Sequence, residues 1–88
     1  MPEQRSNVNN SQTYVVEEDG FTFETVEQHN GQATVIRFPL DSKSYNAGDV
    51  LLVLSGTEIQ FHGMISSIAD GWATASDHRG SLLPASVQ

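Results

Sequence analysis

Short apolar runs separated by turn dipeptides characterise the chain from Thr13 onward. Segment 14–16 (YVV) is followed by Asp19-Gly20, and segment 21–24 (FTFE) alternates apolar and polar residues. That period of two places both Phe rings on one face of a strand. Asp-Gly is a strong signal for a hairpin turn. We therefore expect a β-hairpin near the start of the domain.

Two further strands are predicted by the next apolar runs. Asn30-Gly31 indicates a second tight turn, because both residues tolerate positive φ. Segment 33–38 (ATVIRF) then forms a third strand, which ends at Pro39. Segment 50–54 (VLLVL) is apolar without alternation, which is typical of a central strand covered on both faces.

The C-terminal part of the chain repeats the same alternation of run and turn. Segment 59–68 predicts a strand, and Gly63 inside it suggests a bulge or a sharp bend. Asp70-Gly71 then predicts a turn into a strand over residues 72–76, and a short segment over 82–87 closes the chain.

These patterns together define the fold class and the domain boundaries. No window shows a capped apolar stripe of helical period, so we expect no long helix. Short strands at even spacing in about 75 residues favour an all-β protein, a small SH3-like barrel of five to seven short antiparallel strands. An OB-type barrel is the near alternative. Residues 1–12 carry almost no aliphatic side chains, which predicts a disordered N-terminal tail before a single domain over residues 13–88.

Charge and composition narrow the classes of partner. The chain has 88 residues, eleven acidic against four basic ones, and a net charge of −7. Such a surface repels nucleic-acid phosphates and anionic membranes, so we expect neither as a partner. With no cysteine there is no disulfide framework, thiolate zinc site or cysteine nucleophile. The polar N-terminus resembles no targeting segment, which predicts a cytoplasmic protein.

The sequence shows no arrangement typical of catalysis. His29, His62 and His78 are too far apart in sequence to form a ready pair of metal ligands. No serine lies in a strand–elbow–helix pattern, and no glycine-rich phosphate loop occurs. We therefore expect a protein that is not an enzyme, with no catalytic residue, no metal and no cofactor.

Two features remain that indicate binding. Trp72 directly follows a predicted turn at the barrel rim, where a half-exposed indole offers a flat apolar platform. The acidic run over residues 17–19 (EED) is explained by solvated turn charge. Mimicry of DNA by carboxylates stays open as a sharper interpretation of that run.

The second half of the chain resembles an SH3 domain. The resemblance is carried by Gly48-Asp49 before a hydrophobic strand, by Asp70-Gly71-Trp72, and by segment 82–87 (LLPASV). SH3 domains bind extended, proline-rich peptides on an aromatic groove. The resemblance implies that Trp72 and Pro84 occupy groove positions. With Tyr45 and Asp41 from the polar loop over residues 40–48, they make our candidate peptide- and protein-binding site.

A second resemblance is to the plasmid-borne, trimethoprim-resistant dihydrofolate reductases. It rests on the order of Phe38-Pro39, Ser55-Gly56, Gly63-Met64-Ile65 and segment 78–81 (HRGS) along the chain. Those enzymes are homotetramers of SH3-like barrels around one pore. Leu82-Leu83 stands where their pore tetrapeptide is expected, so no catalytic residue is carried over.

We expect a small non-enzymatic module that binds a protein or peptide partner through the rim around Trp72. One alternative is an oligomeric barrel enzyme that builds its site in a shared pore. The other is an acidic phage or mobile-element protein that acts in assembly or inhibition. A homo-oligomer is compatible with all three, because a core of this size is marginal alone.

Overall fold

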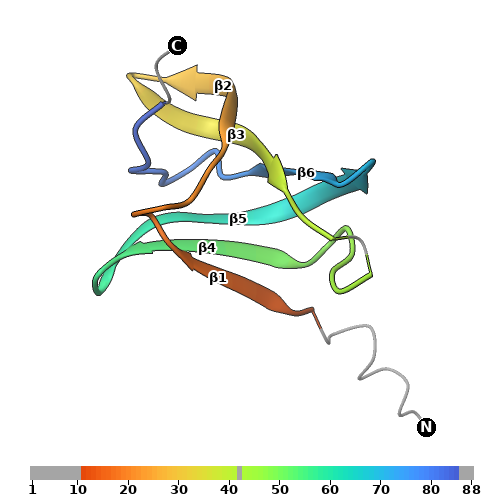
Figure 1. Ribbon diagram of the computed structural model, residues 1–88. Helices are drawn as coiled ribbons and strands as arrows, with labels where there is room; N and C mark the ends of the chain where they lie inside the picture. The colour runs from red at the N-terminus through yellow and green to blue at the C-terminus, as the bar shows by residue number, and fades with distance from the viewer. Residues whose placement is uncertain (1–10, 42, 86–88) are drawn as a thin grey trace, which may run out of the picture.

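A single β-sheet forms the protein in the computed structural model, which describes residues 11–41 and 43–85. Its six strands are β1 (Thr13–Glu17), β2 (Glu24–His29), β3 (Gln32–Pro39), β4 (Val50–Ser55), β5 (Glu58–Ala69) and β6 (Trp72–Ser76). Their order across the sheet is β1-β4-β5-β6-β3-β2 (Figure 1). These residues form no helix, and hence none that could cross a membrane. The prediction of a small all-β domain is confirmed.

Two of the predicted turns have the backbone that the sequence demands. Asn30 and Gly31 have φ of 54° and 82°, and Asp70 and Gly71 have φ of 57° and 79°. Two successive left-handed residues define the type I′ turn, whose twist matches that of the strands it joins. The β2–β3 and β5–β6 hairpins follow from these turns.

The predicted first hairpin does not form. β1 pairs in parallel with β4, whereas the other four pairings are antiparallel. Gly20 has a φ of 90° but Asp19 stays outside the left-handed region, so no type I′ turn arises. Residues 21–23 lie outside the strands, and Phe21 instead places its ring 5.5 Å from the ring of Phe38. Burial of this ring outweighs the local turn preference.

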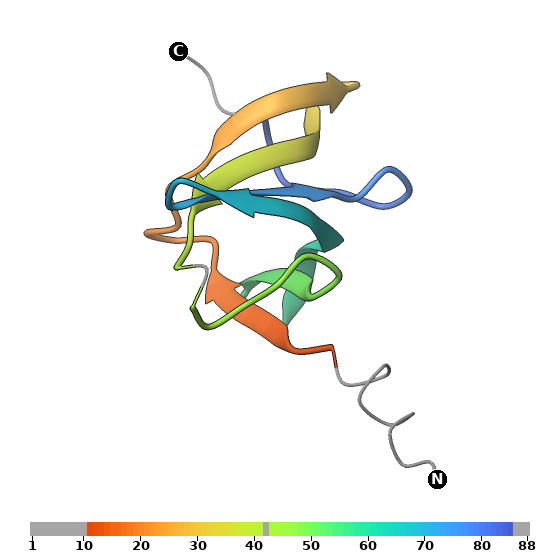
Figure 2. The same cartoon turned by 90° about the vertical axis from the view of Figure 1, so that its right-hand side faces the viewer.

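The sheet bends so strongly that its inner face encloses the core (Figure 2). Tyr14 of β1 stacks on Phe38 of β3, with 6.2 Å between ring centroids, although three strands separate β1 from β3 in the sheet. The two edge strands do not pair with each other, so the curl stays open. The largest fully buried side chains are Phe38, Phe61, Ile36, Leu51, Ile65, Leu83 and Val53.

β4 is covered on one face only, so the expectation of cover on both faces was wrong. Leu51 and Val53 are fully buried, whereas Val50, Leu52 and Leu54 are partly exposed. A single curled sheet has only its inner face to pack, and the described residues supply no second layer over the outer one.

Gly63 marks a close approach between β5 and β6. A Cβ at this position would lie 2.6 Å from Cε1 of Phe61 and would collide with the backbone oxygen of Ser76. The register shifts along β5 fall opposite Val53/Leu54 and between Ile65 and Ser67. Gly63 therefore permits tight packing where a larger residue has no space.

Both ends of the domain are tied to the sheet. Gln12 donates its N–H to Oδ1 of Asp49 at 3.0 Å, and its carbonyl accepts from the N–H of Val50 at 2.9 Å. The folded part thus includes Gln12, while residues 1–10 of the predicted tail lie outside the described residues. Near the C-terminus, Pro84 forms an isolated bridge with Gln32, and Leu83 is buried.

Candidate protein-binding groove

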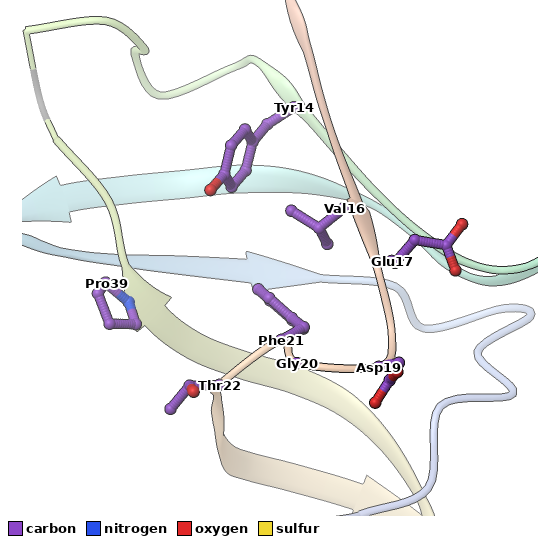
Figure 3. A pocket seen from close by; sticks show the side chains of 8 residues that line it. All are labelled: Tyr14, Val16, Glu17, Asp19, Gly20, Phe21, Thr22 and Pro39. Atoms are coloured by element: carbon purple, nitrogen blue, oxygen red, sulfur yellow. The ribbon is translucent and has the colours of Figure 1, made fainter.

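An open groove lies where β1 faces the end of β3 without pairing to it. Two adjoining hollows of about 410 Å³ and 530 Å³ share Tyr14 and Pro39 in their walls. The first continues along β1 to Val16 and Phe21, and the second continues to Leu40 and Tyr45. In Figure 3, Tyr14 and Val16 point from β1 into the first hollow, and Glu17 points to the other side of the strand. We call the two hollows together the groove.

Two tyrosines form the aromatic part of the groove. The rings of Tyr14 and Tyr45 lie 5.0 Å apart between centroids, at an interplanar angle of 56°. Tyr14 faces inward because alternate residues of a strand share one face, and it rests on Phe38. Tyr45 comes from the loop over residues 40–49. Both side chains are partly buried, so each contributes a ring surface to the groove.

The loop that carries Tyr45 is fixed by Asp49. Only 6% of Asp49 is exposed, and its carboxylate accepts from the N–H of Gln12 at 3.0 Å and from the N–H of Asn46 at 2.8 Å. Its carbonyl also accepts from the N–H of Ile65 at 2.7 Å. The carboxylate thus joins the loop to the start of β1, and the backbone carbonyl joins it to β5. Sequence reasoning treated Asp49 only as the residue before a strand and missed this role.

The groove carries negative charge without a balancing cation. Glu17 and Asp19 line the first hollow, Asp41 lines the second, and no Lys, Arg or His among the described residues lines either. Asp41 also accepts from the N–H of Lys43 through Oδ1 at 2.9 Å, and no other described residue hydrogen-bonds its second oxygen. The groove therefore attracts cationic groups.

Trp72 lies beside the groove, and its side chain is on the side of β6 that faces away from the core. It pairs with Pro39 across the β3–β6 ladder and is partly buried. The guanidinium carbon of Arg37 lies 4.5 Å from the ring centroid of Trp72, and Arg37 is paired with Glu24 at 3.1 Å. One face of the indole is thus occupied by Arg37.

Pro84 lies far from the other candidate residues. It bridges to Gln32 at the start of β3, whereas Trp72 pairs with Pro39 at the end of the same strand. At about 3.3 Å per residue, the two positions are separated by about 23 Å of strand. The structure brings Tyr45 and Asp41 together, places Trp72 next to them, and leaves Pro84 at the opposite end. Sequence reasoning missed Tyr14, which joins the groove only through long-range pairing, and Pro39, which directly precedes the loop of Asp41.

Neither a group of metal ligands nor a known relative indicates a function for this protein. Among residues 11–41 and 43–85, no group of three or more His, Asp or Glu side chains could hold a metal ion. Comparison with protein families, with curated proteins and with solved structures finds no match for the chain. Because a fold does not by itself define a function, the groove is the feature of this protein that bears on its function.

Proposed function

We propose that this protein is a non-enzymatic binding module that holds an extended, basic segment of a partner protein in the groove. The observation that carries this proposal is the pair of tyrosines, Tyr14 and Tyr45, with Asp41 beside them in an open groove. Tyrosine provides a broad apolar contact and a hydroxyl that can hydrogen-bond a partner's backbone.

An extended ligand suits the shape of the groove. The hollows continue one another along β1 and share Tyr14 and Pro39, so they form a slot and not a closed cavity. An extended or polyproline II segment has little conformational entropy left to lose and presents side chains at regular intervals. Such a segment can place one side chain in each hollow.

The charge of the groove selects the side chains of the ligand. Asp19 and Asp41 stand at the two ends, one in each hollow. A Lys or Arg on the ligand gains an ion pair with either carboxylate, and near Tyr14 or Tyr45 it gains a cation–π contact. An acidic segment would be repelled by the groove and by the net charge of −7.

Peptide titration tests the proposal. The probe is a nine-residue peptide of alternating Pro and Lys, and its partner is a matched peptide with Glu for Lys. Binding is followed by the fluorescence of the single tryptophan, Trp72, and by amide chemical shifts. We expect the basic peptide alone to bind, with shifts at Tyr14, Tyr45 and Asp41.

Matched variants locate the site. Tyr45→Ala and Asp41→Asn should each weaken binding of the basic peptide by about tenfold, which corresponds to about 1.4 kcal/mol. Glu58→Gln is the control, because Glu58 is an exposed carboxylate outside the groove. Equal affinity for both peptides, or binding insensitive to Tyr45→Ala, would contradict the proposal.

A further inference from the structure

The outer face of β1, β4 and β5 carries an ordered pattern of side chains. The strand registers align three rows across it, namely Thr13–Val50–Met64, Val15–Leu52–His62 and Glu17–Leu54–Ile59. Six of these nine positions are apolar. We call this surface the outer face, and it lies on the side of the sheet opposite to the core.

Several of the apolar side chains are open to solvent. Val15 is 52% exposed, Ile59 51% and Met64 58%, although the molecule as a whole is strongly acidic. Neighbouring exposed apolar residues from three adjacent strands form a continuous patch, and such patches mark sites of protein association.

The two flanks of the outer face differ in charge, because one is acidic and the other carries an arginine without an ion pair. On the β1 side, Glu17 is exposed and is followed along the chain by Glu18 and Asp19. One oxygen of Glu17 accepts weakly from the N–H of Gly56 at 3.3 Å, and within residues 11–41 and 43–85 the other oxygen has no hydrogen bond. No Lys, Arg or His of the described chain forms an ion pair with these three carboxylates.

The opposite flank, beyond β5, gathers basic side chains. His62 and Arg79 line two adjoining hollows of about 460 Å³ and 350 Å³, and His78 lines the larger one. Asp77 lines both hollows as well, and its carboxylate accepts from the backbone N–H groups of His62 at 2.9 Å, Arg79 at 3.4 Å and Gly80 at 3.3 Å. Arg79 therefore stands exposed, without an ion pair in the part of the chain that the structure describes.

We propose that the outer face binds a second copy of this chain in a two-fold symmetric dimer. A surface with acidic side chains on one flank, an apolar centre and the guanidinium of Arg79 on the other flank can pair with a second copy of itself. When the two-fold axis runs along the strands through Leu52, Glu17 of each copy faces the row of Ile59 and Arg79 in the other. An axis across the strands would instead set the two β1 flanks, with Glu17, against each other, so charge selects the first arrangement.

We place a second copy on this face because the face supplies both halves of the contact. Its apolar rows can pack on the same rows of the other copy, and Glu17 can meet Arg79. The apolar rows meet each other, as two sheets do when they pack with nearly aligned strands. The two ion pairs that result offset the repulsion between two chains of charge −7. The ring surfaces of the groove lie on the opposite side of β1, and the two surfaces share only the acidic residues Glu17 and Asp19 at their border.

Charge reversal tests the dimer and its symmetry. Sedimentation equilibrium of the full chain should show a reversible dimer, and Glu17→Arg or Arg79→Glu alone should raise the dissociation constant by about tenfold or more. In an equimolar mixture of the two variants, each heterodimer has two attractive contacts, so dimerisation should return. Glu27→Arg on β2 is the control, since it makes the same charge change on an exposed residue away from the outer face.

A substitution in the apolar centre completes the test. Val15→Asp should abolish the dimer, and circular dichroism should show an unchanged fold because Val15 is already half exposed. A monomer at all concentrations up to about 1 mM would overturn the proposal. So would a dimer that survives Val15→Asp, or one that the mixture of charge variants fails to restore.

Discussion

Tyr14 and Phe38 stack with 6.2 Å between their ring centroids and 11° between their planes, although β4, β5 and β6 lie between their strands in the sheet. The contact shows how an open sheet encloses a core. The curl is closed by side chains across the opening and not by backbone hydrogen bonds between its edges. Because the backbone leaves a gap there, the same ring that closes the core also forms a wall of the groove.

Removing the Tyr14 ring should therefore loosen the domain. We expect Tyr14→Ala to lower the free energy of unfolding by about 2–3 kcal/mol, because it removes a partly buried aromatic that contacts Phe38 and Tyr45. Tyr14→Phe keeps the ring and should cost less than about 1 kcal/mol. Urea denaturation followed by Trp72 fluorescence measures both. Equal losses for Ala and Phe would show that the hydroxyl, and not the ring, stabilises the fold.

Local patterns predicted most of the strands, because turn chemistry acts between neighbours in sequence. Asn30-Gly31 and Asp70-Gly71 adopt the left-handed conformations that their residue types favour. The partner of β1 was not predictable in this way. Its parallel pairing with β4 joins residues 37 positions apart, such as Thr13 and Val50, and no local signal encodes such a choice.

The groove was predicted in part for the same reason. Tyr45 and Asp41 belong to one loop, so the prediction that this loop takes part in binding included both residues. Tyr14 joins them only through the pairing of β1 with β4 and the curl of the sheet, whereas Pro39 directly precedes their loop. Pro84 was placed with Trp72 by resemblance alone, and the length of β3 keeps the two apart.

Asp49 should be among the most sensitive polar residues of the domain. Asp49→Ala removes a buried carboxylate and leaves the part-buried N–H groups of Gln12 and Asn46 without their acceptor. Two orphaned donors should cost about 2–4 kcal/mol of unfolding free energy. The loop of Tyr45 should also lose protection, which hydrogen exchange of the amides of Asn46 and Gly48 measures. Unchanged exchange at these amides would show that the loop is held by other contacts.

Gly63 offers a direct test of close packing between β5 and β6. Gly63→Ala places a methyl group against Phe61 and the Ser76 carbonyl, so we expect a loss of about 1–3 kcal/mol. Gly80→Ala is the matched control, because a Cβ there meets nothing within 4 Å. Thermal unfolding of the two variants compares them. A similar melting temperature for both would mean that β6 moves aside at no cost.

The stack of Arg37 on Trp72 predicts separate effects on stability and on fluorescence. The ion pair between Arg37 and Glu24 joins side chains that are 43% and 58% exposed, so Glu24→Gln should change stability by less than about 1 kcal/mol. Arg37→Ala removes the guanidinium whose carbon lies 4.5 Å from the ring centroid of Trp72. This uncovers one face of the indole, so Trp72 emission should shift to longer wavelength. Glu24→Gln should leave most of that emission unchanged, because the guanidinium can remain on the ring without its carboxylate partner. If Glu24→Gln shifts the emission as far as Arg37→Ala does, the carboxylate is what holds Arg37 over Trp72, and the ion pair orients the stack.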